Sequence, residues 1–441
     1  MRSPLLFMSL KASILRHIFW VNDFFAGSPI RSQYVDVRNK QTGRVSTEKS
    51  IADFLDFTTT HCVFYKAYKG KPLSTFPVVN KNIIRENMEG IRVPEEQNPW
   101  QKPGTSYHIQ KTSGSTGAPF AVPQDTRKRN RRIAELKYSG ELLGFRSHDE
   151  LVQLRIWTKW QSKGWWQRTK ENIFPFDCSN LNEQHLAELC ELIAATKAKS
   201  LRGYSSSFEL LARHMLQHGI SLPTVKVIIA GAETLYDSTR EAVAKAMPGC
   251  HIISQYANEE CGIMAQERAG KPGIYHFNRA SYVFEVLKPD SDAPAEDGEL
   301  GRIVVTDLYN YACPMVRYDT GDMCIRRHDA QGVPYIEKLF GRRLDMLFNT
   351  AGEPVFPMYF ARVLKNYDRI AQWQFIQQGE KKYLLKLSLT VGGEFTAIAE
   401  ILTAIRELLG TNAEISVEYV NDIPVLGSGK RKCVINEWRK L

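Results

Sequence analysis

Hydrophobic residues alternate between helical and strand-like spacing along the middle of the chain. Residues 186–193 and 207–215 repeat apolar positions three and four apart, which predicts two helices that each bury one face. Residues 225–229 and 251–254 are short apolar runs that predict buried strands, and another helix is predicted to begin near Asp237. Strands that alternate with helices in this way indicate an α/β core.

The pattern changes after residue 281. Residues 282–287 and 301–306 predict two paired strands, because β-branched and aromatic residues flank an acidic, proline-containing loop. Beyond Gly341 the chain predicts a compact unit, with a strand, a helix and a second strand at residues 383–391, 395–409 and 415–420. The fold class is therefore predicted as α/β, with a large multi-layer N-terminal α/β domain and a small C-terminal α+β domain.

The chain has 441 residues, which is too long for one ordinary hydrophobic core. We therefore expect three segments: a helical lead-in packed on the body (residues 1–100), an α/β core (residues 101–340) and the small C-terminal domain (residues 341–441). Lys11, Arg16 and Asp23 interrupt the apolar N-terminus, so no run reaches the ~20 residues that span a bilayer. Peripheral membrane contact is the less favoured alternative there.

Composition places the protein among globular chains of a reducing compartment. The eight cysteines form no CxxC pair, which favours free thiols and a cytoplasmic location. The net charge of +10 suits anionic ligands. The basic segment 127–132 lacks interleaved aromatic residues, so no nucleic-acid partner is expected, and it is either a solvated helix face or a site for a phosphate-bearing cosubstrate.

A glycine- and hydroxyl-rich run carries the clearest candidate chemistry. Its backbone N–H groups and hydroxyls can approach a polyphosphate closely, and its members are Ser113, Gly114, Ser115, Thr116 and Gly117. The run lacks the GxxxxGK[ST] spacing of a P-loop, so it does not indicate a kinase or ATPase of that class.

Five further motifs follow the glycine run in order. They are Gly231-Ala232-Glu233, Tyr256-Ala257-Asn258-Glu259-Glu260, Arg317-Tyr318-Asp319-Thr320-Gly321-Asp322, Gly341-Arg342 and Gly427-Ser428-Gly429-Lys430. The ordered set resembles the adenylate-forming superfamily of acyl-CoA synthetases, adenylation domains and luciferases. It is most similar to the phenylacetate–coenzyme A ligase branch, which includes capsular polysaccharide biosynthesis proteins.

The resemblance implies an enzyme that activates a carboxylic acid with ATP and Mg²⁺, releases pyrophosphate, and passes the acyl group to coenzyme A. It implies that the small C-terminal domain is a lid whose Lys430 reaches the α-phosphate. Glu260 would help to hold Mg²⁺, with Glu259 as the alternative, and Asp322 would bind the ribose hydroxyls. Arg342 would contact ribose or phosphate, residues 231–233 would contact adenine, and Tyr256 would lie near the adenine or the acyl group.

Some features depart from the family or leave the acceptor open. Leu344 stands where the family carries the first of two acids after Gly-Arg, which puts lid rotation for the thioester step in doubt. Transfer to an amine is therefore the first alternative, and a non-catalytic nucleotide- or nucleic-acid-binding protein is the second. Trp157 and Trp160, with Tyr256, could line an acyl pocket. Zinc is not expected at Cys261, His276 and Cys313, because a fourth ligand is missing.

Overall fold

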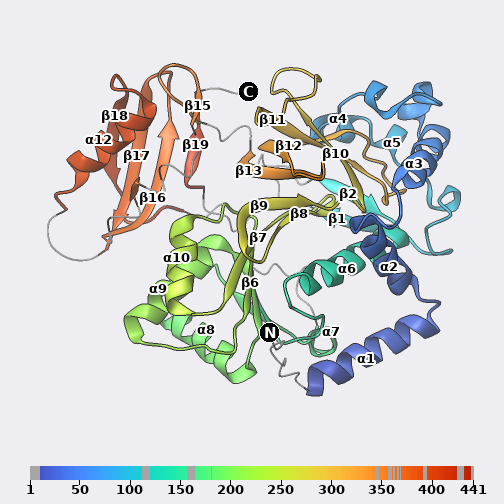
Figure 1. Cartoon of the computed structure of the whole chain (residues 1–441), viewed down its shortest axis with the longest axis horizontal. Helices are drawn as coiled ribbons and strands as arrows, with labels where there is room; N and C mark the ends of the chain where they lie inside the picture. The colour runs from blue at the N-terminus through green and yellow to red at the C-terminus, as the bar shows by residue number, and fades with distance from the viewer. Residues whose placement is uncertain are drawn as a thin grey trace.

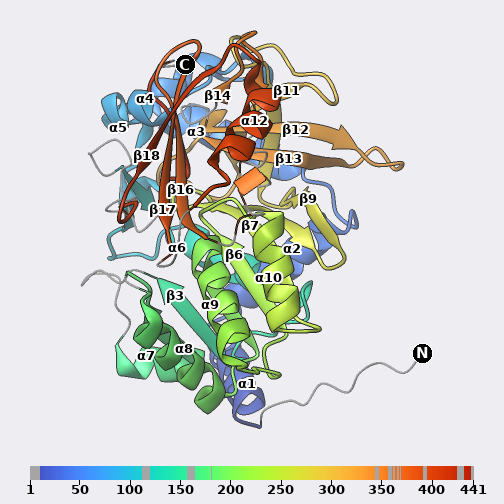
Figure 2. The same cartoon turned by 90° about the vertical axis from the view of Figure 1, so that its left-hand side faces the viewer.

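The computed structural model shows a large body with a smaller lobe beside it (Figures 1 and 2). It describes residues 10–111, 120–155, 164–179, 181–342, 347–355, 360, 363–364, 367, 369–390, 395–424 and 432–438, and only the backbone of Arg342 and Pro354. In these ranges no helix is both long enough and apolar enough to cross a bilayer.

A mixed sheet forms the centre of the body. In the described part of the chain it has 11 strands, in the order β10-β11-β12-β13-β9-β8-β7-β6-β5-β3-β4. Their bounds are β3 (Leu151–Arg155), β4 (Ile173–Asp177), β5 (Ser200–Tyr204), β6 (Val227–Gly231), β7 (His251–Asn258), β8 (Gly262–Arg268), β9 (Lys271–Phe277), β10 (Tyr282–Leu287), β11 (Leu300–Asp307), β12 (Tyr318–His328) and β13 (Pro334–Arg342). The run from β4 to β7 is parallel, and the rest of the sheet is antiparallel. The predicted α/β class is confirmed.

Helices cover the parallel half of the sheet (Figure 1). They are α7 (Trp165–Glu171), α8 (Glu183–Thr196), α9 (Ser205–His218) and α10 (Asp237–Ala246). Phe208 and Leu211 of α9 pack with Leu201 and Ile228 of the sheet in one buried cluster. This is the apolar face that the spacing of residues 207–215 predicts. The Asn182 side chain caps α8 by accepting the N–H of His185.

The first hundred residues are mostly helical, and residues 51–93 pack on the antiparallel half. Their elements are α1 (Leu10–Phe25), α2 (Pro29–Gln41), α3 (Glu48–His61), α4 (Lys81–Glu86), α5 (Met88–Ile91) and three short 3₁₀ turns at Val63–Tyr68, Leu73–Thr75 and Glu95–Gln97. Phe54 and Tyr65 belong to the same buried cluster as Ile303 and Tyr318 of the sheet. Val79 also bonds the backbone of β12 at Asp319.

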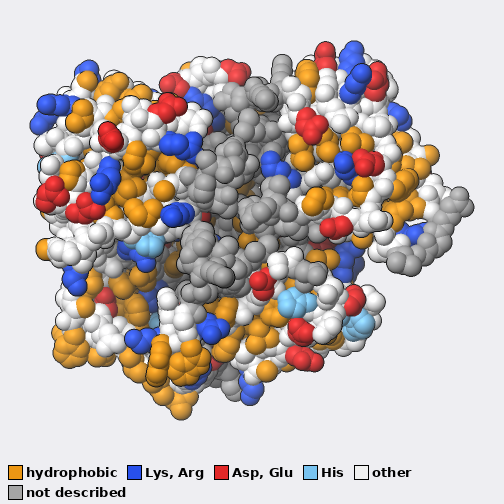
Figure 3. Space-filling view, turned by 180° about the vertical axis from the view of Figure 1, so that it is seen from behind, with side chains coloured by type: hydrophobic (Ala, Val, Ile, Leu, Met, Phe, Trp, Pro, Cys, Tyr) orange, Lys and Arg blue, Asp and Glu red, His pale blue; other side chains and the backbone are white. Residues whose placement is uncertain are grey.

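One face of α1 is exposed in the described part of the chain. Leu10, Ile14, Ile18, Val21 and Phe25 recur three or four positions apart, and all are exposed. Apolar side chains gather along the lower edge of the molecule on this side (Figure 3). The opposite face is attached to the body, since Arg16 forms an ion pair with Asp149 at 2.8 Å.

The basic segment 127–132 lies in helix α6 (Thr126–Glu141). Two of its cations fit neither predicted role, the solvated helix face or the phosphate site. Lys128 is fully buried and forms an ion pair with Asp307 at 2.5 Å. Arg131 is also buried, and it donates to Asp36 and to the carbonyl of Ala280. These two cations face the interior because α6 packs between α2 and the sheet, so neither is a solvated cation or a phosphate ligand.

The smaller lobe has its own sheet and core. Its four-stranded sheet has the order β18-β17-β16-β19, with β16 (Ile370–Gln377), β17 (Lys382–Leu389), β18 (Glu414–Tyr419) and β19 (Val434–Asn436). Helix α12 (Ile398–Leu409) and the short pair β14 (Leu347–Phe348) and β15 (Pro354–Val355) complete it. Ile401, Ile405 and Leu409 of α12 pack with Phe375 and Leu385 of the sheet. The predicted strand, helix and strand are confirmed to within a few residues at their ends.

Candidate functional site

A tyrosine and an aspartate meet where β7 and β12 lie near each other. The Tyr256 hydroxyl donates to Oδ2 of Asp322 at 2.8 Å, and Thr320 Oγ1 lies 3.2 Å from the same hydroxyl. Tyr256 is 7% exposed and Asp322 9% exposed. Burial raises the pKa of Tyr256, and the negative charge of Asp322 raises it further, so the hydroxyl stays protonated and acts as a donor at neutral pH.

The backbone turn at Gly321 precedes Asp322 and sets its position in β12. Gly321 has φ 77°, a conformation that glycine adopts without steric strain, and its N–H bonds Oδ1 of Asp319. Asp322 then lies opposite Arg342 in the register of β12 and β13. Two predicted site residues therefore occupy neighbouring strands, although the Arg342 side chain lies outside the described atoms.

The acidic pair Glu259–Glu260 occupies the turn between β7 and β8. Glu260 is 2% exposed, where its carboxylate forms an ion pair with Lys81 of α4. The Tyr318 hydroxyl donates to the same carboxylate at 3.3 Å. Glu260 is therefore a buried carboxylate with a cationic partner. The geometry separates a buried Glu260 from a more exposed Glu259.

The base of the glycine-rich run is bound to this acidic turn from both sides. The hairpin of β1 (His108–Lys111) and β2 (Ala121–Gln124) carries residues 112–119 between its strands. Gln110 Nε2 donates to Glu259 at 2.6 Å, and Gln124 Nε2 donates to the backbone carbonyl of Glu260 at 3.2 Å. Both arms of the hairpin therefore contact the acidic turn, although Ser113 to Gly117 are outside the described residues.

The turn after β6 lies at the same end of the parallel strands as Tyr256. Gly231 pairs with Gln255, the residue before Tyr256, so the turn and the tyrosine share one sheet edge. Ala232 has φ 65°, a strained value for a residue with a Cβ atom. The Glu233 carboxylate accepts the N–H of Ser206 at the start of α9, where a negative charge is favourable.

Within the candidate site, the carboxylates that could hold a divalent cation are those of the acidic turn. Carboxylate oxygens suit Mg²⁺, and the Lys81 ammonium already places a positive charge against Glu260. A cation bound to Glu260 would therefore have to replace or join Lys81. Glu259 is also engaged, by Gln110 and by Arg155 at 3.2 Å. The donor set fits Mg²⁺ by its chemistry.

Other predicted residues lie elsewhere or outside the described part. Trp157, Trp160, Leu344 and Lys430 are among the residues that the structure does not describe. In the described ranges, the ligand atoms of Cys261, His276 and Cys313 do not form a metal-binding group.

Lys81, Gln110 and Gln124 are the functional candidates that sequence reasoning missed. All three contact the acidic turn through their side chains. The two glutamines flank the glycine-rich run closely, so a prediction of the hairpin could have found them. Lys81 has no local signal, because its partner is distant in the sequence.

Comparisons with known proteins agree with the architecture. Residues 347–437 match the family described as the CapK C-terminal domain. The chain is 23% identical to protein CapK of Staphylococcus aureus, over 98% of both chains. It is 24% identical to a phenylacetate-coenzyme A ligase of Pseudomonas putida, over 83% of this chain and 77% of that protein.

Solved structures show the same fold. The structure of 2-hydroxyisobutyryl-CoA ligase in the postadenylation state, bound to 2-HIB-AMP, gives a TM-score of 0.69 at 18% identity, and the match covers 88% of this chain and 89% of that one. The same ligase in the thioesterification state gives 0.53, with 90% and 91% covered.

Proposed function

Because the chain is homologous to CapK and to the phenylacetate–coenzyme A ligases, we propose that it is an ATP-dependent ligase that activates a carboxylic acid. A carboxylate oxygen of the acid attacks the α-phosphorus of ATP, and the bond to the β-phosphate oxygen breaks. The products are an acyl adenylate and pyrophosphate. A thiol, with coenzyme A as the first candidate, then attacks the acyl carbon, and AMP leaves.

One observation carries this proposal. The Tyr256–Asp322 pair, the acidic turn, the hairpin base and the turn after β6 come from four separated segments. Hydrogen bonds and strand register link them around one end of the sheet. Joining two anions requires neutralised charge and aligned groups, which such a cluster supplies.

Each part of the cluster has a proposed role. Asp322 accepts both ribose hydroxyls, oriented by the Tyr256 hydroxyl, and Arg342 adds a cationic donor beside it. The run from Ser113 to Gly117 binds the β- and γ-phosphates, and residues 231–233 receive the adenine. Mg²⁺ held by Glu260 or Glu259 neutralises phosphate charge when bound.

We also propose that the smaller lobe is a lid that begins after β13. Trp373 of β16 lies against Tyr236, three residues beyond Glu233, with ring centroids 6.2 Å apart. The lobe therefore meets the body next to the turn assigned to adenine. Lys430, on the same lobe, is proposed to stabilise the negative charge that develops at the α-phosphate.

The experiment is ATP–pyrophosphate exchange measured across a panel of aryl and aliphatic acids. We expect exchange with at least one acid, and Lys430→Ala should remove most of it while the protein stays folded. Lys432→Ala is the matched control, because it changes a neighbouring cation in the same segment and should retain exchange. Equal loss in both variants contradicts the role of Lys430, and no exchange with any acid favours a non-catalytic nucleotide-binding protein.

An amine acceptor is the second candidate, and one observation favours it. Leu344 replaces the acid expected at the hinge of a lid that rotates for thioester formation. Following AMP release after adding coenzyme A or amines to the acyl-adenylate complex distinguishes the two acceptors. Release with coenzyme A supports the ligase, and release with amines alone supports an amide synthetase.

A further inference from the structure

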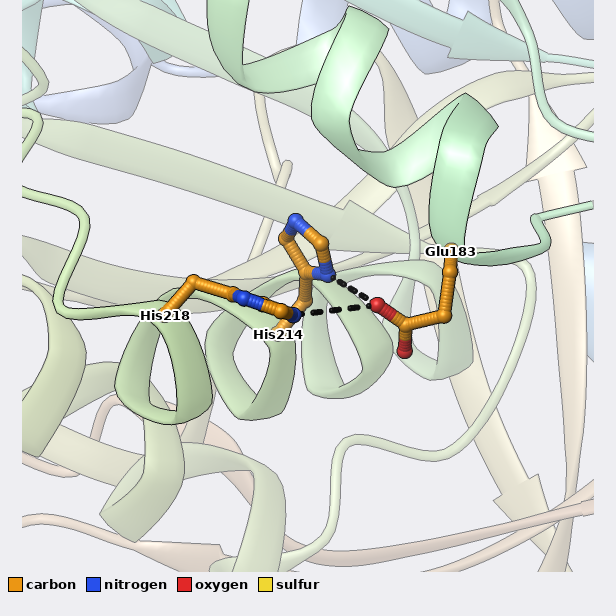
Figure 4. Close-up of side chains that lie close together, drawn as sticks. All are labelled: Glu183, His214 and His218. Atoms are coloured by element: carbon orange, nitrogen blue, oxygen red, sulfur yellow. Dashed lines mark hydrogen bonds and ion pairs between the residues drawn. The ribbon is translucent and has the colours of Figure 1, made fainter.

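Two histidines and a glutamate meet between α8 and α9, away from the candidate site. His214 and His218 are one helical turn apart on α9, and Glu183 is the first residue of α8 (Figure 4). Glu183 Oε2 lies 2.8 Å from Nδ1 of His214 and 3.2 Å from Nε2 of His218. The three candidate ligand atoms all lie within 4.8 Å of one another.

The spacing of these atoms matches a metal site. In tetrahedral zinc sites with imidazole and carboxylate ligands about 2.0–2.2 Å from the ion, neighbouring ligand atoms are about 3.3–3.6 Å apart. The observed separations of 2.8 and 3.2 Å need only a small opening to admit the ion. Residues four apart on a helix share one face, so α9 presents both imidazoles to the same point.

The three side chains differ in how far they are exposed to solvent. The His214 side chain is 4% exposed and fixed by packing, while the side chains of His218 and Glu183 are 45% and 66% exposed. The position facing solvent can therefore be filled by water. Two neutral imidazoles and one carboxylate leave a bound divalent ion with a net charge of +1.

We propose that Glu183, His214 and His218 bind one Zn²⁺ ion, with water completing its coordination. The ion joins the start of α8 to the end of α9. Ser206, whose N–H binds Glu233, is at the other end of α9, about 12–18 Å away at 1.5 Å per residue. The site is therefore a structural clamp on the helical layer and takes no part in the chemistry proposed for the body.

A nearby pair supplies the matched control. His185 and Glu188 of α8 lie 2.9 Å apart on the surface, and they resemble the proposed site without its second imidazole. His218→Ala is the informative variant, because His218 is half-exposed and its removal should leave the core intact. Glu183→Gln tests the carboxylate.

The test is calorimetric titration of the chelator-treated full-length protein with Zn²⁺ alone, together with its melting temperature with and without Zn²⁺. We expect one ion per chain and a Zn²⁺-dependent rise in melting temperature. His218→Ala should weaken binding at least tenfold and abolish the rise, Glu183→Gln should weaken it, and His185→Ala should change neither. The metal-free melting temperature of His218→Ala should equal that of the parent.

Three outcomes overturn the proposal. They are identical Zn²⁺ isotherms for the parent and His218→Ala, an equal loss of binding in His185→Ala, and no binding by the parent at millimolar Zn²⁺. Binding that survives His218→Ala would belong to other groups, such as the free cysteines. If any of these outcomes is observed, Glu183 is an ordinary carboxylate that accepts hydrogen bonds from His214 and His218.

Discussion

At the scale of single residues, the candidate site depends on the hydrogen-bond partner of each polar side chain. Tyr256 is a buried residue of the core, and its hydroxyl also donates a hydrogen bond to Asp322. Arg317, in the same motif as Asp322, has a structural role instead. It donates to Glu285 and to the carbonyls of Ser74 and Phe76, which anchors the first hundred residues on the sheet.

Asp322→Asn should weaken ATP binding about 10- to 100-fold. The reason is that hydrogen bonds to a charged group contribute about 1.5–3 kcal/mol. Tyr256→Phe removes only a neutral donor and should have a smaller effect, about 2- to 10-fold. The measurement is the dissociation constant for ATP by calorimetry, with circular dichroism as the folding control. A larger effect of Tyr256→Phe than of Asp322→Asn would contradict the assignment of Asp322 to the ribose.

At the scale of elements, α6 shows how a basic helix can be internal. Asp125 caps its start by accepting the N–H of Lys128, and it also accepts the N–H groups of Tyr311 and Ala312. The Asp125 side chain therefore holds the start of α6 against the loop that precedes the motif beginning at Arg317. Lys128 reaches Asp307, and desolvation raises the pKa of nearby Glu135 while Lys128 lowers it.

Lys128→Met should destabilise the protein by about 3–5 kcal/mol, because it leaves the buried Asp307 carboxylate without its cation. The double variant Lys128→Met with Asp307→Leu should recover part of this loss. Arg129→Met, at an exposed neighbouring position, should change stability by less than about 0.5 kcal/mol. Urea unfolding followed by tryptophan fluorescence measures all three. A neutral Lys128→Met would show that the ion pair contributes nothing net.

At the scale of the whole molecule, the described residues join the lobe to the body at two places. One is the Trp373–Tyr236 pair beside the turn after β6. The other is an apolar cluster in which Met323 and Phe340 of the body pack with Phe348 and Trp438 of the lobe. The cluster lies where the body ends and the lobe begins, because Phe340 belongs to β13 and Phe348 to β14.

Trp373→Ala should shift the lobe away from the arrangement seen here. An aromatic pair contributes about 0.5–1.5 kcal/mol beyond buried area, so the population of this arrangement relative to others should fall about 2- to 12-fold. Small-angle scattering with ATP bound should report a larger radius of gyration than for the parent. Leu384→Ala, in a neighbouring strand of the same lobe, is the control. An unchanged radius in Trp373→Ala would contradict the contact.

Much of the fold could be predicted from the sequence because its elements are specified locally. The helices at residues 186–193 and 207–215 and the strand pair at 282–287 and 301–306 follow from periodicity, and the structure contains all of them. The chemistry of Tyr256 and Asp322 could likewise be identified as candidates from their motifs. Their mutual contact could not, since β7 and β12 are distant in the sequence and are not neighbours in the sheet.

The sequence by itself determined the elements, the α/β class and the residue types of the motifs, since periodicity and turn chemistry act within a few residues. Only the tertiary structure decided which acid of the pair is buried against Lys81, and that Lys128 and Arg131 are internal. It also brought Glu183 to the two histidines of α9. These outcomes depend on which distant segments pack together, and each partner that neutralises a charge comes from a different part of the chain.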